Sequence, residues 1–113
     1  DAPLFAPSRR LDFELELGTV VGLPPEPGHP ISAEDASGLI FGHVLLNDWS
    51  ARDIQGWESE PLGPFQGKAT ATTISPWIVT AEALRPFRVP PPPREAPVLP
   101  YLEESGPTAL AIA

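Results

Sequence analysis

Seven residues near the start of the chain alternate strictly between apolar and acidic side chains. They are Leu11, Asp12, Phe13, Glu14, Leu15, Glu16 and Leu17. An alternation of period two predicts a β-strand, with its apolar side chains packed on a core and its three carboxylates on the opposite face. Neighbouring carboxylates on that face lie about 7 Å apart in an extended strand. Either water solvates these like charges, or a hard cation such as Ca²⁺ or Mg²⁺ binds between them.

The same analysis of apolar and polar positions predicts several further short elements. The predicted strands cover residues 11–21, 39–47 and 72–80, and the predicted helical turns cover residues 31–37, 50–57 and 81–84. Ser32 followed three residues later by Asp35 is typical of a helix N-cap. Residues 22–30 are rich in proline and glycine and therefore predict a turn. The chain as a whole predicts a mainly β fold with short helices.

A dense group of polar residues lies in the middle of the chain. Ser50 followed by Asp53 resembles a capping box, which predicts that a helix begins near Ser50. If Asp48 joins the same turn, Asp48, Arg52 and Gln55 share one helical face. That face would offer a carboxylate, a guanidinium and an amide to a ligand. The alternative is a solvated helix in which Asp48 and Arg52 form an ordinary surface ion pair.

Residues 61–68 form a proline- and glycine-rich turn that presents Lys68. The turn differs from a phosphate-binding loop, which has four residues between its glycines and a Ser or Thr after the lysine. Here three residues separate Gly63 from Gly67, and Ala69 follows the lysine. Lys68 is therefore either an exposed lysine or a single donor held by a turn before a strand.

Composition narrows the classes of partner and site. The chain has 113 residues and a formal net charge of −8, which argues against nucleic acid and anionic membranes as partners. It lacks cysteine, so disulfides and thiolate metal sites are excluded. No apolar run of about 18 residues predicts a membrane span, and a cytoplasmic protein is expected. Because the chain lacks methionine and starts at Asp1, we expect a fragment of a larger protein.

Residues 86–100 are rich in proline and include four consecutive prolines, Pro90 to Pro93. Such a run favours polyproline II and cannot enter the interior of a sheet. We expect a surface loop here. The alternative is a ligand for an SH3-like or WW-like groove, with Arg88 or Arg94 as the flanking charge.

Four segments, taken in order, resemble the fumarylacetoacetase family, also called the fumarylacetoacetate hydrolase family. They are the acidic strand at 10–16, NDWSARDIQGWE at 47–58, PLGPFQGK at 61–68 and TTISPW at 72–77. The resemblance implies that residues 1–113 form one partial domain, the central part of a catalytic domain built as a β-roll or sandwich. It also implies metal-dependent hydrolysis of the C–C bond of fumarylacetoacetate to fumarate and acetoacetate, the last step of tyrosine catabolism.

The resemblance implies roles for individual residues as well. The metal positions, for Ca²⁺ and/or Mg²⁺, are Glu14, Glu16, Asp48, Lys68 and Thr72, and the catalytic or substrate-binding positions are Arg52, Gln55, Lys68 and Ser59. Ser59 stands where the family commonly has a tyrosine that touches the substrate. The family's water-activating histidine and the glutamate that orients it have no counterpart in this sequence. We therefore expect the isolated chain to be inactive.

The resemblance leaves two alternatives open. One is an acylpyruvate hydrolase, or an isomerase or decarboxylase of 2-oxo acids, from the same superfamily. The other is a non-catalytic, proline-rich interaction module. For the leading interpretation, the family implies a small 1,3-diketo acid as substrate and a homodimer as the assembled state.

Overall fold

The computed structural model describes residues 4–111, which form short strands and a few short helices. The strands are β1 (Leu11–Asp12), β2 (Leu15–Val21), β3 (Ile40–Ala51), β4 (Ala71–Ile74), β5 (Val79–Thr80), β6 (Arg88–Val89) and β7 (Ala109–Leu110). The α-helices are α1 (Ala33–Ala36), α2 (Arg52–Glu58) and α3 (Ala81–Leu84), and the 3₁₀ turns are η1 (Ser37–Leu39), η2 (Gln66–Lys68), η3 (Arg85–Phe87) and η4 (Pro100–Leu102). The expected mainly β fold with short helices is confirmed, and the sheets are not closed.

Strand β3 is the strand with which β1, β2, β4 and β5 all pair. The chain divides into two compact units, and both β2 and β3 contribute residues to each of them. None of the helices in the described part of the chain has the length and apolar character needed to cross a membrane.

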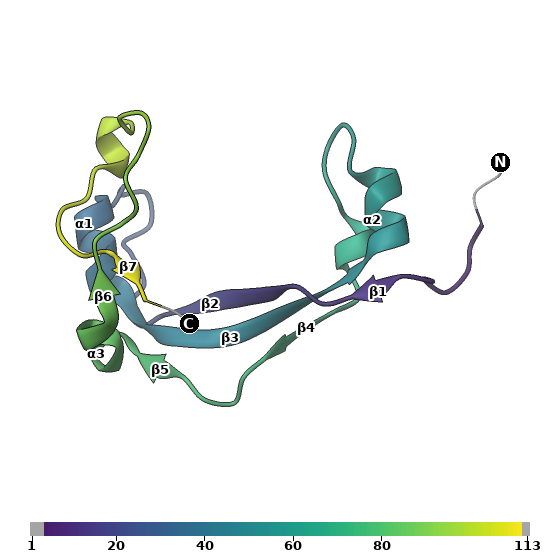
Figure 1. The fold of residues 1–113 in the computed structure, drawn as a ribbon, viewed down its shortest axis with the longest axis horizontal. Coiled ribbons are helices and arrows are strands. Elements are labelled where there is room, and N and C mark those ends of the chain that lie inside the picture. The colour runs from purple at the N-terminus through teal and green to yellow at the C-terminus, as the bar shows by residue number, and fades with distance from the viewer. Residues whose placement is uncertain (1–3, 112–113) are drawn as a thin grey trace. The chain divides into compact units, whose positions relative to one another are not determined.

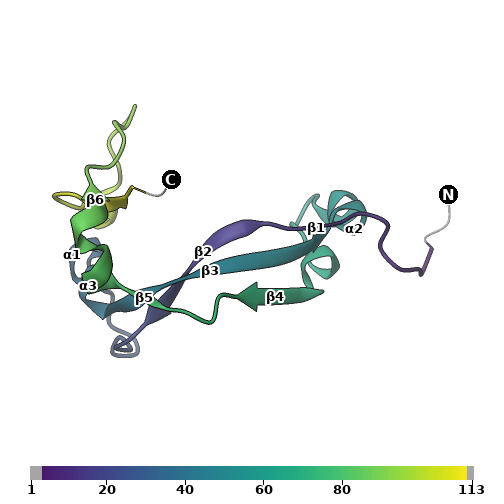
Figure 2. The same cartoon turned by 60° about the horizontal axis from the view of Figure 1, so that its bottom comes forward.

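The first unit comprises residues 4–18 and 45–76. In it, β3 pairs antiparallel with β1 and with β4, and Asp48 of β3 lies opposite Thr72 of β4. Figure 2 shows β4 running beside this end of β3. Helix α2 follows β3 directly, and the chain then returns through η2 to begin β4 (Figure 1). This topology brings the acidic strand, the end of β3, α2 and η2 together.

The second unit comprises residues 19–44 and 77–111. Here Gly42 of β3 lies opposite Thr80 of β5, and β6 pairs antiparallel with β7. The pairing of β3 with β5 requires a residue without a side chain, because a Cβ at Gly42 would lie 2.5 Å from the carbonyl oxygen of Val79. Residues 90–99, the centre of the proline-rich segment, carry no helix or strand.

Two helical turns begin where their sequences predict. Ser32 caps α1 by accepting a hydrogen bond from the backbone N–H of Asp35 at 3.0 Å. Helix α3 covers residues 81–84 as expected, and its cap is Thr80, whose hydroxyl accepts from the N–H of Ala83. Both signals are local, since the capping oxygen and its donor are three residues apart.

The predicted start of the central helix is wrong. Ser50 is not an N-cap: it lies within β3, is completely buried, and donates its hydroxyl to the carbonyl of Asp48 at 3.0 Å. Helix α2 begins at Arg52 instead. Pairing with β1 extends β3 to Ala51, so strand hydrogen bonds outweigh the local capping signal. Asp48 is consequently a strand residue and does not share a helical face with Arg52.

The predicted burial of the apolar face of residues 11–17 is also wrong for the part of the chain described. Leu11, Phe13, Leu15 and Leu17 are 55, 62, 71 and 43% exposed. The predicted strand is interrupted at Phe13 and Glu14 as well, because β1 ends at Asp12 and β2 begins at Leu15. No described segment covers this face. The alternation places the apolar and acidic side chains on opposite faces, but it does not determine what packs against the apolar face.

Candidate active site

The acidic segment is held against the end of β3 by backbone hydrogen bonds on either side of Glu14. The N–H of Glu14 donates to the side-chain oxygen of Asn47 at 3.1 Å, and its carbonyl accepts from the N–H of Asp48 at 3.0 Å. In β1, Asp12 lies directly opposite Ser50. Alternation then places the carboxylates of the acidic segment beside Asp48.

Three carboxylates form a group that could hold a metal ion. One oxygen from each of Glu14, Glu16 and Asp48 lies within 4.8 Å of the others. Two oxygens bound to one ion are at most about 5 Å apart for Ca²⁺ and about 4.2 Å apart for Mg²⁺. An all-oxygen donor set of this size suits a hard divalent cation.

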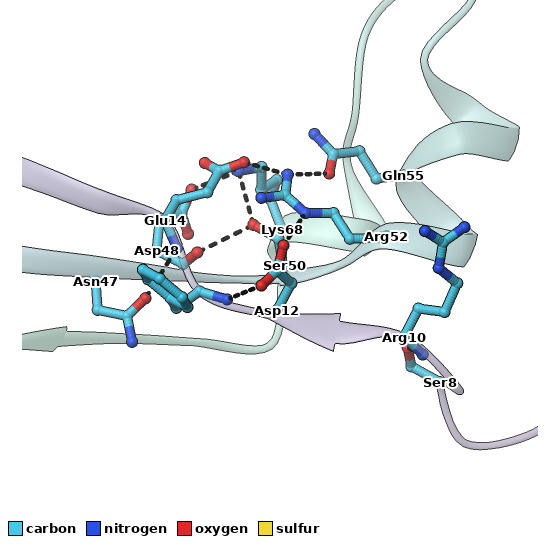
Figure 3. A network of polar contacts seen from close by, with 11 residues as sticks. Ser8, Arg10, Asp12, Glu14, Asn47, Asp48, Ser50, Arg52, Gln55 and Lys68 are labelled. Carbon is cyan, nitrogen blue, oxygen red and sulfur yellow. Dashed lines mark hydrogen bonds and ion pairs between the residues drawn. The ribbon is translucent and has the colours of Figure 1, made fainter.

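The ammonium group of Lys68 contacts two of these carboxylates, those of Glu14 and Asp48 (Figure 3). Its Nζ donates to the carboxylate of Glu14, to Asp48 Oδ2 at 3.1 Å and to Ser50 Oγ at 2.9 Å. Since Asp48 and Ser50 are two residues apart on β3, their side chains share a face of the strand. The lysine thus uses all three of its N–H donors on elements far from it in sequence.

The guanidinium of Arg52 occupies the other side of Glu14. Its Nε donates to Asp12 Oδ2 at 3.0 Å, and its Nη1 donates to the carboxylate of Glu14 and to Gln55 Oε1 at 2.9 Å. Arg52 is the first residue of α2 and Gln55 lies one turn later, so the helix orients both. In Figure 3 the side chains of Arg52 and Lys68 converge on Glu14 from α2 and from η2.

These contacts shift the ionisation of the groups that make them. Hydrogen bonds from Lys68 and then from Arg52 lower the pKa of Glu14. The hydrogen bond to Glu14 raises the pKa of Lys68, and hydrogen bonds to Asp12 and then to Glu14 raise the pKa of Arg52. All these charged forms are therefore favoured at neutral pH.

The charges of the cluster do not cancel. Its carboxylates are those of Asp12, Glu14, Glu16 and Asp48, and its cations are those of Arg52 and Lys68. Four negative groups against two positive groups leave a formal charge of −2. That charge equals in magnitude the charge of one divalent cation, which supports the fit of the carboxylate group to Ca²⁺ or Mg²⁺.

The loop that carries Lys68 is attached to α2 by a carboxylate at the end of the helix. Glu58 accepts backbone hydrogen bonds from Phe65 at 2.7 Å, from Gln66 at 3.0 Å and from Gly67 at 2.6 Å. The hydrogen bond from Gly67 is the main cause that lowers the pKa of Glu58. Gly67 itself is buried, and a Cβ there would lie 2.8 Å from the Cα and the N of Gln55.

The structure brings most of the residues singled out by the sequence into one group. These are Glu14, Glu16, Asp48, Arg52, Gln55 and Lys68. Thr72 is exposed and lies opposite Asp48 in the β3–β4 pair. Ser59 is also exposed, and its hydroxyl donates to the carbonyl of Gln55. The alternative of an Asp48–Arg52 surface pair is not what forms, because Arg52 pairs with Asp12 and Glu14.

The sequence analysis gave no active-site role to two further residues of the group, Asp12 and Ser50, or to Glu58, which lies outside it. Asp12 orients Arg52 by accepting a hydrogen bond from it. The alternation of residues 11–17 had already placed Asp12 on the same strand face as Glu14 and Glu16. Ser50 contacts Lys68, but its position before Asp53 favoured a capping role instead. Glu58 accepts hydrogen bonds from backbone N–H groups seven to nine residues later in the chain. No periodicity of the sequence predicts that contact.

Comparisons of the sequence with a family model and with curated proteins indicate the same family. The sequence model of the family described as "Fumarylacetoacetate (FAA) hydrolase C-terminal" matches residues 1–97. The chain is 59% identical over 102 residues to fumarylacetoacetase of Arabidopsis thaliana, covering 90% of this chain and 24% of that protein. It is 55% identical over 111 residues to the enzyme of Dictyostelium discoideum, covering 97% of this chain and 26% of that protein.

A mammalian relative gives similar values. The chain is 54% identical over 105 residues to fumarylacetoacetase of Rattus norvegicus, covering 93% of this chain and 25% of that protein. The chain thus spans about a quarter of the length of the curated relatives it matches. Because the family match covers far more than half of its residues, the chain belongs to the fumarylacetoacetate hydrolase C-terminal family.

Proposed function

We propose that this chain is the part of a fumarylacetoacetase that carries its metal-binding carboxylates and several polar groups of its active site. The reaction is hydrolysis of a C–C bond of fumarylacetoacetate, giving fumarate and acetoacetate, the last step of tyrosine catabolism. One observation carries the proposal: Lys68 and Arg52 converge on the carboxylate of Glu14, and Lys68 also contacts Asp48, in a chain 54 to 59% identical to fumarylacetoacetases.

The chemistry of the substrate explains what such a site must provide. Water adds to one carbonyl of the 1,3-diketo acid, and the C–C bond then breaks with its electron pair leaving as an enolate. Negative charge develops on oxygen in both steps, so fixed N–H donors and positive charges lower the barrier. A bound Ca²⁺ or Mg²⁺ supplies Lewis-acid polarisation of a carbonyl.

Glu14, Glu16 and Asp48 are the residues we propose to hold the main cation. Lys68 and Thr72 are proposed to lie beside a second, Mg²⁺-type ion. The all-oxygen character of the carboxylate group and its excess of two negative charges support the first assignment. For the second, the support is the position of Thr72 opposite Asp48, which Lys68 also contacts.

Arg52, Gln55 and Lys68 are proposed to bind the reacting part of the substrate. Lys68 and Arg52 already have carboxylate and amide partners, so their positions are set before substrate arrives. Ser59 is proposed to face the substrate as well. It is smaller than the tyrosine common in the family.

The wider proposal concerns the whole enzyme. Residues 1–113 are proposed to be the central part of the catalytic domain, with residues 86–100 as a surface loop, in a cytoplasmic homodimer. The match to the C-terminal family model over residues 1–97 and the coverage of about a quarter of each relative support this placement. The residues that activate water are then expected elsewhere in the longer protein.

Turnover by the full-length enzyme tests the proposed function. After treatment with a chelator the enzyme should lose hydrolysis of fumarylacetoacetate, and addition of Ca²⁺ or Mg²⁺ should restore it. Acylpyruvates assayed in parallel should have a much lower kcat/KM. Preference for acylpyruvate, or full activity in the presence of chelator, would contradict the proposal.

A further inference from the structure

Glu58 stands apart from the residues assigned so far, because it contacts no residue of the carboxylate group and yet is attached to the element that carries Lys68. It is the last residue of α2 and is half-buried. Its carboxylate accepts hydrogen bonds from three consecutive backbone N–H groups, those of Phe65, Gln66 and Gly67, at 2.6 to 3.0 Å. No side chain of the turn caps η2 itself.

These three hydrogen bonds satisfy the donors that a 3₁₀ turn leaves unpaired at its start. Because a carboxylate accepts them, they are stronger than hydrogen bonds between neutral groups. The hydrogen bond from Gly67 lowers the pKa of Glu58, which keeps the carboxylate ionised at neutral pH. Phe65 offers no alternative cap, since its side chain has no acceptor.

Gly67 fixes the distance between the loop and the helix. It is buried, and a Cβ at this position would come within 2.8 Å of backbone atoms of Gln55. The loop therefore rests directly on the backbone of the helix that also carries Arg52 and Gln55. Lys68 is the next residue, and its Nζ reaches Asp48 and Ser50 at 3.1 and 2.9 Å.

We propose that Glu58 is the positioning residue for Lys68, acting through the backbone of residues 65–67. The three hydrogen bonds hold η2 on α2, so the lysine and Arg52 share one rigid support. A displacement of about 1 Å in a group that stabilises the transition state is enough to lower a rate by up to about 100-fold. This inference rests on the proposed function only for its kinetic consequence.

A double-mutant cycle in the full-length enzyme tests whether Glu58 acts through Lys68. Glu58→Gln keeps the size of the side chain but removes its charge and turns one acceptor into a donor. We expect kcat for fumarylacetoacetate to fall by about 10- to 100-fold, with a smaller change in KM. In the Lys68→Met background the same substitution should change kcat less than about twofold. Glu60→Gln, an exposed neighbour, is the matched control and should leave kcat unchanged.

Hydrogen exchange gives a second reading that does not depend on activity. In Glu58→Gln the amides of residues 65–67 should exchange faster, whereas those of β3 should keep their protection. Equal loss of kcat in both backgrounds, or unchanged exchange at residues 65–67, would overturn the inference. If Glu58→Gln does not fold, Glu58→Asp, which keeps the charge but withdraws the carboxylate by one methylene, enters the same cycle. A wild-type enzyme inactive on fumarylacetoacetate would contradict the proposed function, while the exchange experiment still decides the role of Glu58.

Discussion

At the scale of single residues, the three carboxylates of the candidate metal group differ in what neutralises them. Glu14 contacts both Lys68 and Arg52, and Asp48 contacts Lys68. Glu16 makes no ion pair with any cation in residues 4–111. Among the three carboxylates, that of Glu16 is the one whose negative charge is not balanced by an ion pair in the described part of the chain. A divalent cation would therefore depend most strongly on Glu16.

Substitution of Glu16 should weaken cation binding without disturbing the network around Lys68. In the full-length enzyme, Glu16→Gln should raise the dissociation constant for Ca²⁺ at least about tenfold, because one charged ligand becomes neutral. Calorimetric titration measures this directly. Glu34→Gln, which removes an equal charge from the exposed helix α1, should leave the constant unchanged. Equal affinities in all three proteins would remove Glu16 from the metal site.

At the scale of elements, β3 organises the chain because most of the other strands pair with it. Its register positions Asp48 and Ser50 toward Lys68, and its last residue, Ala51, leads directly into α2. At Gly42 the same strand approaches β5 so closely that no side chain fits. Asp48 and Ser50 of β3 therefore help to form the candidate site, whereas Gly42 permits the pairing of β3 with β5.

A methyl group at Gly42 should disrupt the pairing of β3 with β5. Gly42→Ala places a Cβ 2.5 Å from the carbonyl oxygen of Val79 and 3.0 Å from the Cα of Thr80, both backbone atoms that cannot move aside alone. We expect a loss of about 1–3 kcal/mol in the free energy of unfolding, measured by thermal or denaturant unfolding.

Gly38→Ala is the matched control for this substitution. No atom lies within 4 Å of a Cβ at Gly38, and its backbone does not have a positive φ. It should leave stability unchanged or raise it slightly by restricting the unfolded chain. If both variants lost the same stability, close packing at Gly42 would not be the cause.

The elements also show which parts of the structure the sequence could predict. Ser32 was correctly identified as a cap because the capping contact spans three residues. Ser50 has the same local signal, yet it lies in a strand because β1 pairs with β3 at that point. The contact of Glu58 with its loop depends on the turn between them, so neither periodicity nor capping rules could reveal it.

At the scale of the whole molecule, the polar group and the proline-rich segment belong to different units. Every residue of the group lies within residues 4–18 or 45–76, whereas residues 86–100 belong to the other unit. Among the apolar residues described, Val44 and Ala51 are buried, and many large ones are exposed. With about a quarter of the length of its relatives, this chain supplies a site whose activity we assign to a longer protein.

The central claim is that the donors gathered around the carboxylates lower the barrier to C–C hydrolysis, and Lys68 tests it most directly. In the full-length enzyme, steady-state kinetics with fumarylacetoacetate should show that Lys68→Met lowers kcat by about 100-fold or more, because a preorganised positive charge beside a developing oxyanion is lost. Arg88→Met removes a positive charge of similar reach from β6, in the other unit, and should leave kcat unchanged. Comparable kcat values for the two variants would contradict the account, since Lys68 would then be no more than a surface lysine.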